Sequence, residues 1–248
     1  MRRHELSDAE WEFVRPLLPV SLRGRKRLDD RRVLNGIVWK FRTGTAWRDV
    51  PERYGPWATL HTRFRRWAAD GTFDRMLRAA QAKADAAGDI EWLVSVDSTI
   101  VRAHQHGAGG SKRGLRDPAL GRSRGGLTSK IHLACDGRGR PLGFVVTGGN
   151  TNDCTRFTAV MEAIRAWLRR RGIPHTIPER ADQVGNRARR GSRGGRPPAF
   201  DREAYKHRNV VERCFNRLKQ WRGVATRYDK TAQSYEAAVT LASLLMWA

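Results

Sequence analysis

The sequence predicts an α/β protein in which a helical amino-terminal region precedes a mixed sheet flanked by helices. Apolar residues recur at helical spacing through the first third of the 248-residue chain. Near Gly88 the pattern changes to short apolar, β-branched runs separated by turns. Helical patterns then return between and after the strands, which indicates an α/β layer architecture. We therefore expect a helical domain over residues 1–86 and an α/β domain over residues 87–248.

The chain carries a large positive charge. Lys and Arg total 48 and Asp and Glu total 25, so the formal net charge is +23. A field of this sign attracts polyanions, and each neutralised phosphate releases counterions, so we expect a nucleic-acid partner. An arginine-rich ribosomal protein, or codon bias in a GC-rich genome, would give a similar composition. Charge alone leaves these alternatives open.

Neither a disulfide framework nor a membrane anchor is expected. Cys135, Cys154 and Cys214 are far apart and form no CxxC pair. The amino terminus leads into no apolar run, so we expect no signal peptide. The longest apolar stretch, residues 237–248, is shorter than the roughly 20 residues that cross a bilayer. These features predict a soluble, cytoplasmic protein that joins the nucleoid when it binds DNA.

Four helices are expected in the first domain. Ser7-Asp8-Ala9-Glu10 is a capping box that begins the first helix. Residues 31–42 carry an apolar stripe and are followed by Thr43-Gly44, which ends the second helix. We expect Thr59 to cap a third helix over residues 60–69, and a fourth helix to begin at Thr72.

The third of these helices is basic. It contains Arg63, Arg65 and Arg66. Several short helices with a basic third one are typical of a helix-turn-helix-like DNA reader. We predict that the three arginines contact DNA. The alternative is a helical domain whose arginines are only solvated.

The second domain begins with a strand that carries an acid. Residues 92–97 are apolar and β-branched, as in a buried strand that ends at Asp97. Residues 130–134 and 142–147 are expected to form a hairpin around the turn Asp136-Gly137-Arg138-Gly139. Open α/β sheets place ligands at the carboxyl ends of their strands, so Asp97 is a candidate site residue.

The rest of the second domain is predicted from the same patterns. The expected segments are a basic loop over residues 107–126, a helix over 153–171, a short strand over 173–177, a basic Gly-rich loop over 180–198, and helices over 202–221 and 232–247.

The helix after residue 202 presents four polar side chains on one face. They are Tyr205, Arg208, Glu212 and Lys219. Their separations of three, four and seven residues place them within an arc of roughly 60°. A separate apolar stripe of Val211, Phe215 and Leu218 can pack on a sheet. The alternative is a solvated face with an ion pair between Arg208 and Glu212.

The spacing Tyr205-x2-Arg208-x3-Glu212-x6-Lys219 resembles the Tyr-Arg-Glu-Lys pattern of a large group of insertion-sequence DDE transposases. Residues 94–99 look like the strand that bears the first acid of that family, and residues 130–133 and 149–153 resemble further family stretches. Residues 6–51 resemble the helical domain that precedes the catalytic core. The resemblance covers almost the whole chain.

The resemblance implies a ribonuclease-H-like core in which three carboxylates bind two divalent ions, usually Mg²⁺ or in its place Mn²⁺. By match, Asp97 is the first carboxylate and Glu212 the third. Arg208 and Lys219 are similar to family residues that hold the DNA backbone near the cut, and Tyr205 would orient a phosphate or simply pack. The implied function is metal-dependent cleavage of double-stranded DNA at terminal inverted repeats and its joining to target DNA, by a homo-oligomer on DNA.

The resemblance breaks at the second acid. Relatives place it at the end of a strand beside that of Asp97, after a helix that resembles residues 160–165. In this chain that segment runs directly into residues 166–172, which resemble the helix after the missing strand. We infer an internal deletion with its seam near Arg165. No other Asp follows a β-like run as Asp97 does, so we expect no replacement.

The deletion has two expected consequences. The two-ion site would be impaired, and a central sheet edge would be left unpaired and prone to aggregate. We therefore predict a transposase of impaired activity. The alternatives are a catalytically dead DNA-end-binding protein that inhibits transposition, and an unstable remnant.

Overall fold

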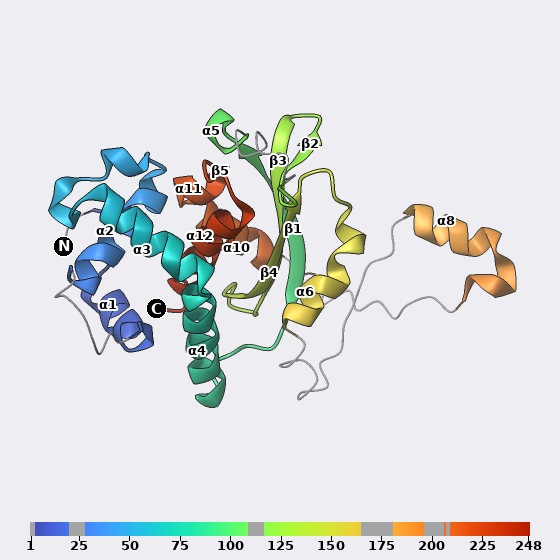
Figure 1. Cartoon of the computed structure of the whole chain (residues 1–248). Coiled ribbons are helices and arrows are strands. Elements are labelled where there is room, and N and C mark those ends of the chain that lie inside the picture. Colours follow the sequence, from blue (N-terminus) through green and yellow to red (C-terminus); the bar gives the residue numbers. More distant parts are fainter. Residues whose placement is uncertain (1–2, 20–27, 109–116, 165–180, 196–205, 207–208) are drawn as a thin grey trace.

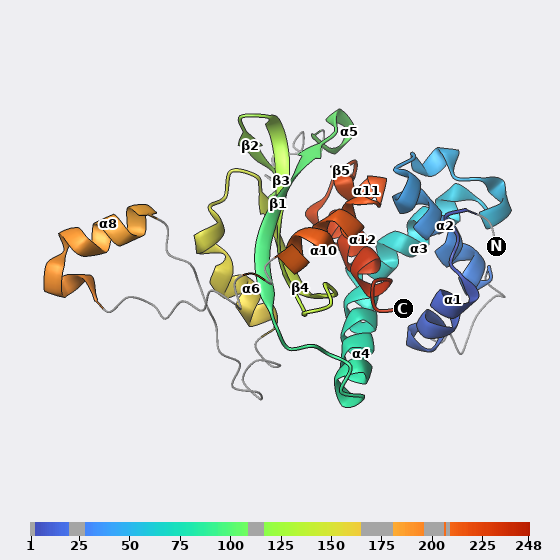
Figure 2. The same ribbon diagram turned by 180° about the vertical axis from the view of Figure 1, so that it is seen from behind.

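The computed structural model describes residues 3–19, 28–108, 117–164, 181–195, 206 and 209–248. A mixed sheet lies at the centre of the molecule, with helices on both faces and the amino-terminal helices packed beyond one of them (Figures 1 and 2). The fold is thus the expected combination of a helical region and a mixed α/β sheet. No helix in these ranges is long and apolar enough to cross a membrane.

The amino-terminal region contains the four expected helices: α1 (Asp8–Val14), α2 (Asp30–Thr43), α3 (Trp57–Ala69) and α4 (Thr72–Ala86), with short 3-10 turns at Arg15–Leu17, Trp47–Asp49 and Glu52–Tyr54. The capping box of Ser7 and Glu10 is confirmed. Gly44 ends α2 at φ 74°, a left-handed conformation that glycine adopts without strain. The prediction that Thr59 caps α3 was wrong, because Pro56 is the cap and α3 begins at Trp57.

The sheet has the hairpin predicted from the sequence, with longer strands. It consists of β1 (Ser95–Ala103), β2 (Gly121–Ser123), β3 (Gly126–Cys135), β4 (Pro141–Gly148) and β5 (Thr226–Arg227). β3 pairs antiparallel with β1 on one edge and with β2 and β4 on the other. β5 runs parallel to β1 and pairs with it only at Arg102 and Ala103. β2 lies inside the segment predicted to be a basic loop, which is a correction.

The first strand differs from the prediction in its limits. β1 begins at Ser95 and continues to Ala103, so Asp97 is its third residue and not its last. The β-branched run Thr99-Ile100-Val101 extends the strand beyond the acid. Asp97 therefore lies along the strand, opposite Leu133 of β3.

The remaining helices are α5 (Gln105–Ala108), α6 (Phe157–Ala163) after a 3-10 turn at Asp153–Thr155, α8 (Ala181–Arg189), a 3-10 turn at Gly191–Gly194, α10 (Asn209–Lys219), α11 (Arg222–Ala225) and α12 (Ala232–Leu244). The prediction of a loop over residues 180–198 was wrong where α8 forms, because its Ala and Arg residues favour a helix despite Gly185. The predicted strand at 173–177 and the proposed seam at Arg165 lie outside the described residues.

The amino-terminal helices and the α/β region share one continuous hydrophobic core. α4 packs against α12, and α2 packs against α11. Across this contact the Gln81 side-chain amide donates to the carbonyls of Pro141 and Leu142 at 3.0 and 2.9 Å. Lys40 of α2 is buried 3.9 Å from the Asp229 carboxylate, and burial lowers the pKa of this lysine while Asp229 opposes that effect.

A buried arginine fastens β5 to the loop before β2. Arg227 is fully buried and donates to the Ser129 hydroxyl at 2.8 Å, to the Ala119 carbonyl at 3.0 Å and to the Asp117 carboxylate. Its guanidinium also donates to the Asp229 carbonyl at 3.1 Å. Every bond of this network depends on one side chain, so removing it would leave Asp117 as an uncompensated charge.

A second polar cluster lies on the α6 side of the sheet. The Asp153 carboxylate accepts from Ser98 Oγ at 2.8 Å and from Lys130 Nζ at 3.0 Å. His132 lies 3.5 Å from the same carboxylate, and its other ring nitrogen is 2.9 Å from Thr147 Oγ1. Burial raises the pKa of Asp153, but the bonds from Ser98 and Lys130 outweigh it and lower the pKa overall. Burial, with help from Lys130, lowers the pKa of His132.

We predict that Arg227→Met lowers the free energy of unfolding by about 3–5 kcal/mol, because it leaves the part-buried Asp117 carboxylate without its guanidinium partner. Urea denaturation measures this change. The matched control is Arg75→Met, whose pair with Asp70 at 3.6 Å is exposed, and which should cost less than about 1 kcal/mol. Equal losses in the two variants would contradict the prediction.

The stability of the protein should fall as the pH drops below about 6.5. The pKa of His132 is lowered in the folded state, so the unfolded chain binds a proton at this residue more readily. Acid pH therefore stabilises the unfolded state relative to the folded state. The contribution of this residue is complete above its unfolded pKa and declines by at most about 1.4 kcal/mol per pH unit below it. His132→Gln should flatten this slope in denaturation curves between neutral and acid pH, whereas His106→Gln, at an exposed position, should leave it in place.

Candidate active site

Asp97 lies on the face of β1 that α10 covers. Side chains alternate along a strand, so Asp97 and Thr99 share one face and Ser98 occupies the other. Thr99 contacts Lys219 of α10, whereas Ser98 contacts Asp153 on the α6 side. The Asp97 side chain is half-buried, and its carboxylate accepts from the backbone N–H of Ser98 at 2.8 Å. This bond fixes the carboxylate close to its own strand.

An apolar stripe holds α10 against the sheet. The stripe consists of Val210, Val211, Cys214, Phe215 and Leu218, all buried. α10 contacts both β1 and β3. Cys214 meets Cys135 of β3, where the neighbouring thiol and burial raise the pKa of Cys135. The thiols of Cys135 and Cys214 are free. The predicted helix and its apolar stripe are thus confirmed from Asn209 to Lys219.

Lys219 ends α10 beside β1. Its ammonium donates to Thr99 Oγ1 at 2.6 Å and lies 3.4 Å from the Ile100 carbonyl. Burial lowers the pKa of this lysine. Thr99 is two residues beyond Asp97 on the same strand face, so Lys219 is bound to the strand that carries the candidate acid. Sequence reasoning named Lys219 but missed Thr99, whose only signal was its i+2 spacing from Asp97.

Glu212 lies on the same stripe of α10 as Lys219. The two residues are seven positions apart, which is close to two helical turns. Glu212 is exposed, and α10 packs on the sheet face that carries Asp97. Asp97 and Glu212 therefore lie on the same side of the sheet. Tyr205 and Arg208, which complete the motif, lie outside the described residues.

The donor set suits a hard divalent cation, but it is small. Asp97 and Glu212 offer carboxylate oxygens, which Mg²⁺ prefers, and Thr99 adds a hydroxyl. In the described ranges no three or more His, Cys, Asp or Glu side chains gather closely enough to hold a metal ion. Two of the expected three acids thus lie on the same side of the sheet, and the part of the chain that the structure describes holds no complete cluster.

Two of the other acids considered from the sequence, Asp153 and Asp136, have partners away from this site. Asp153 lies on the opposite sheet face, bound to Ser98. Asp136 is fully buried in the β3–β4 turn, where Arg140 pairs with its carboxylate at 2.7 Å. Asp182 belongs to α8, and Asp201 lies outside the described residues.

The three arginines of α3 divide into two groups. Arg63 is 7% exposed, and its guanidinium donates to Asp30 of α2 at 2.7 Å. Arg63 therefore joins two helices of the core, and the expectation that it contacts DNA needs correction. The reason is the apolar spacing of α3, which turns position 63 inward together with the buried residues Leu60, Phe64 and Trp67. Arg65 and Arg66 are exposed.

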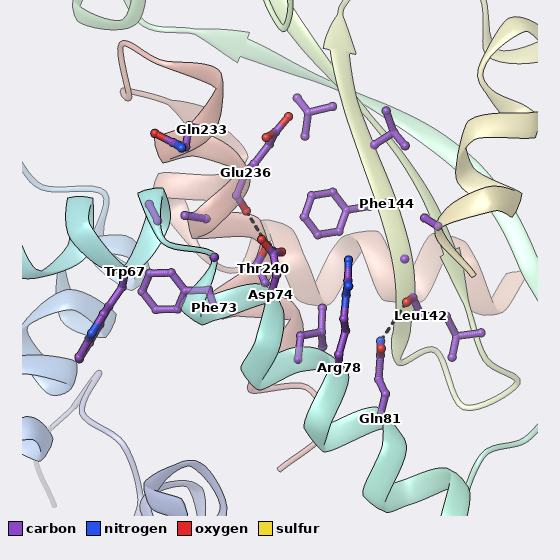
Figure 3. Close-up of a pocket in the computed structure, with 18 of the residues that line it drawn as sticks. Trp67, Phe73, Asp74, Arg78, Gln81, Leu142, Phe144, Gln233, Glu236 and Thr240 are labelled. Carbon is purple, nitrogen blue, oxygen red and sulfur yellow. Dashed lines mark hydrogen bonds between the residues drawn. The ribbon is translucent and has the colours of Figure 1, made fainter. Parts of the chain in front are cut away.

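A cavity of about 780 Å³ lies elsewhere, between α4, β4, α6 and α12 (Figure 3). Figure 3 shows Arg78 extending from α4 into the space beside Phe144, while Gln81 binds the Leu142 carbonyl. Glu236 also lines the cavity, and burial, followed by the nearby Asp74 charge, raises the pKa of this glutamate. Neither Asp97 nor Glu212 lines the cavity, so it is separate from the candidate site.

Comparison with known proteins identifies the family of the chain. Residues 6–77 match the family described as "Putative transposase of IS4/5 family", and residues 89–247 match the family described as "Transposase DDE domain". No solved structure matches the chain.

Three curated proteins are similar to this chain. It is 40% identical over 116 residues to "Uncharacterized protein y4sN" of Sinorhizobium fredii, covering 46% of the chain and 89% of that protein. It is 28% identical over 193 residues to "Putative transposase for insertion sequence element IS402" of Burkholderia cepacia, covering 73% and 89%. It is 28% identical over 134 residues to "Putative transposase for insertion sequence element IS6501" of Brucella ovis, covering 49% and 98%. Because the DDE-domain match spans more than half of the sequence, the chain belongs to the DDE transposases of the IS4/5 type.

Proposed function

We propose that this transposase acts on the DNA ends of an insertion sequence, with Asp97 and Glu212 as the metal-binding acids. The observation that carries the proposal is the packing of α10 on the Asp97 face of β1. That packing brings two carboxylates and the Lys219 ammonium to one side of the sheet. A ribonuclease-H-like core, which the DDE domain implies, uses such acids to cleave and join phosphodiesters.

Each side chain has a distinct proposed role. Asp97 and Glu212 would hold Mg²⁺ or Mn²⁺, which supplies charge for the attacking and leaving oxygens of the phosphodiester. Lys219 would bind a backbone phosphate near the cut, and its bond to Thr99 keeps its ammonium in place. Arg208 would add a second phosphate contact and Tyr205 would orient a phosphate. The net charge of +23 draws the duplex to the protein.

We further propose that this copy is impaired, because the strand that bears the second acid has been deleted near Arg165. The support is the edge of β1 opposite β3, which no described strand covers before Arg102. β3 pairs with β1 from Ser95 to Arg102, but on the other edge β5 pairs only at Arg102 and Ala103. Among the described strands, none covers the edge of residues 95–101. The resemblance to the family implies that the strand of the second acid would lie beside this edge.

A second candidate function follows from the same edge. A protein that keeps its exposed basic helices but lacks one acid would occupy DNA ends without cutting them, and would inhibit an intact copy. Binding of terminal repeats in a mobility shift assay, together with no cleavage in Mg²⁺ or Mn²⁺, would favour this function over the enzyme.

The metal assignment is tested by Mn²⁺ binding to the full chain on duplex DNA. We expect Asp97→Asn and Glu212→Gln each to weaken Mn²⁺ binding by about tenfold or more, because each removes a charged ligand. Any Mn²⁺-dependent cleavage of terminal-repeat DNA should be lost with it. Asp49→Asn, at an exposed acid of the helical region, is the control and should change neither measurement. Binding that survives both substitutions would reject the site.

The free edge of β1 is tested by amide hydrogen exchange. β3 has partner strands on both edges, whereas residues 95–101 of β1 pair with a described strand on one edge only. Alternate amides of that segment should therefore exchange at least about tenfold faster than the amides of residues 129–134 in β3. Uniform protection along both strands would mean that another segment covers the edge, and the proposed deletion of a strand would be wrong.

A further inference from the structure

A small basic hollow lies between the amino-terminal helices and the start of α12. Its volume is about 290 Å³, and Arg65, Arg66 and His61 of α3 line one side. Thr231, Gln233 and Ser234 line the other side. The hollow thus joins a helix inside the first family match, residues 6–77, to a helix inside the second, residues 89–247.

The two arginines of the hollow differ from most arginines around them. Arg63 forms an ion pair with Asp30, and Arg42 forms one with Glu10, each at 2.7 Å. The Arg65 and Arg66 side chains are exposed and form no ion pair or hydrogen bond with any other described residue. Two adjacent guanidinium groups without an acid create an unbalanced positive potential, and a guanidinium matches a phosphate through two parallel bonds.

The other groups of the hollow leave this potential in place. His61 contacts the Trp47 ring at 5.2 Å, and burial, followed by the Arg65 charge, lowers the pKa of the histidine. The nearby acid Asp229 is buried and lies 3.9 Å from Lys40, so it faces another cation. Across the hollow, the Thr231 hydroxyl bonds the Ser234 hydroxyl at 3.0 Å, and Gln233 is exposed.

We propose that this hollow binds one backbone phosphate of duplex DNA, gripped by Arg65 and Arg66 and bordered by the first turn of α12. The inference rests on the proposed function only in taking DNA as the partner. A phosphate held there touches the helical region and the α/β region at once. It therefore positions the duplex relative to the sheet independently of any contact at Asp97 or Glu212.

The test is duplex binding by the full chain, measured by fluorescence anisotropy across a series of NaCl concentrations. We expect the double variant R65A/R66A to bind about tenfold more weakly, and the slope of log affinity against log salt to fall by about 1. The matched control is R75A/R78A, which removes the same charge from exposed positions of α4. It should lose less than R65A/R66A and keep the wild-type slope.

A single substitution tests the contribution of α12. Gln233→Glu places a carboxylate at the edge of the hollow, and an acid in the first turn of a helix does not weaken the helix. We expect it to weaken DNA binding several-fold, while Gln105→Glu, on exposed α5, makes the same charge change without that loss.

The outcomes separate this inference from the proposed function. Wild-type binding with equal losses in R65A/R66A and R75A/R78A would overturn the hollow and leave the transposase function standing. A wild-type chain that does not bind duplex DNA would overturn both. Inorganic phosphate supplies the remaining arm: if it binds the wild-type chain without displacing duplex DNA, and R65A/R66A loses this binding, the hollow holds free phosphate and the DNA assignment is wrong.

Discussion

The candidate site depends on the burial of one helix face against one strand face. Val211, Cys214, Phe215 and Leu218 of α10 are buried, and α10 packs on β1 and β3. Burying such side chains contributes about 1.5–3 kcal/mol each, which far exceeds the gain from an exposed polar contact. The apolar stripe therefore sets the rotation of α10, and the polar stripe that carries Glu212 and Lys219 follows from that rotation.

This ordering explains why much of the fold could be predicted from the sequence. The capping box at Ser7, the apolar stripe of α2 and the hairpin turn at Asp136 are local signals, and each is confirmed. The polar stripe of α10 was visible for the same reason, because helical spacing is a property of neighbouring residues. The family resemblance then connected Asp97 to Glu212, which are 115 positions apart in the chain.

The errors at Arg63 and at the limits of β1 share a physical cause, which is that burial depends on contacts distant in sequence. In the sequence Arg63 does not differ from Arg65 and Arg66, because its partner, Asp30, belongs to another helix. The limits of β1 were misjudged because the half-buried strand continues through residues of mixed polarity, Ser98 and Thr99, whose partners are Asp153 and Lys219. No local pattern reveals such partners. The proposed deletion and the roles of Tyr205 and Arg208 stay predictions.

The continuous core has a consequence for how the protein can be divided. α4 places Met76, Leu77 and Ala80 in the same core as Val239 and Leu241 of α12, and Lys40 lies beside Asp229. A fragment that ended after α4 would expose this apolar surface to water, and Lys40 would lose the carboxylate of Asp229 that lies beside it. The amino-terminal helices therefore do not form an independent module. Because they share one core with the α/β region, a ligand bound to them is held at an orientation to the sheet that this packing sets.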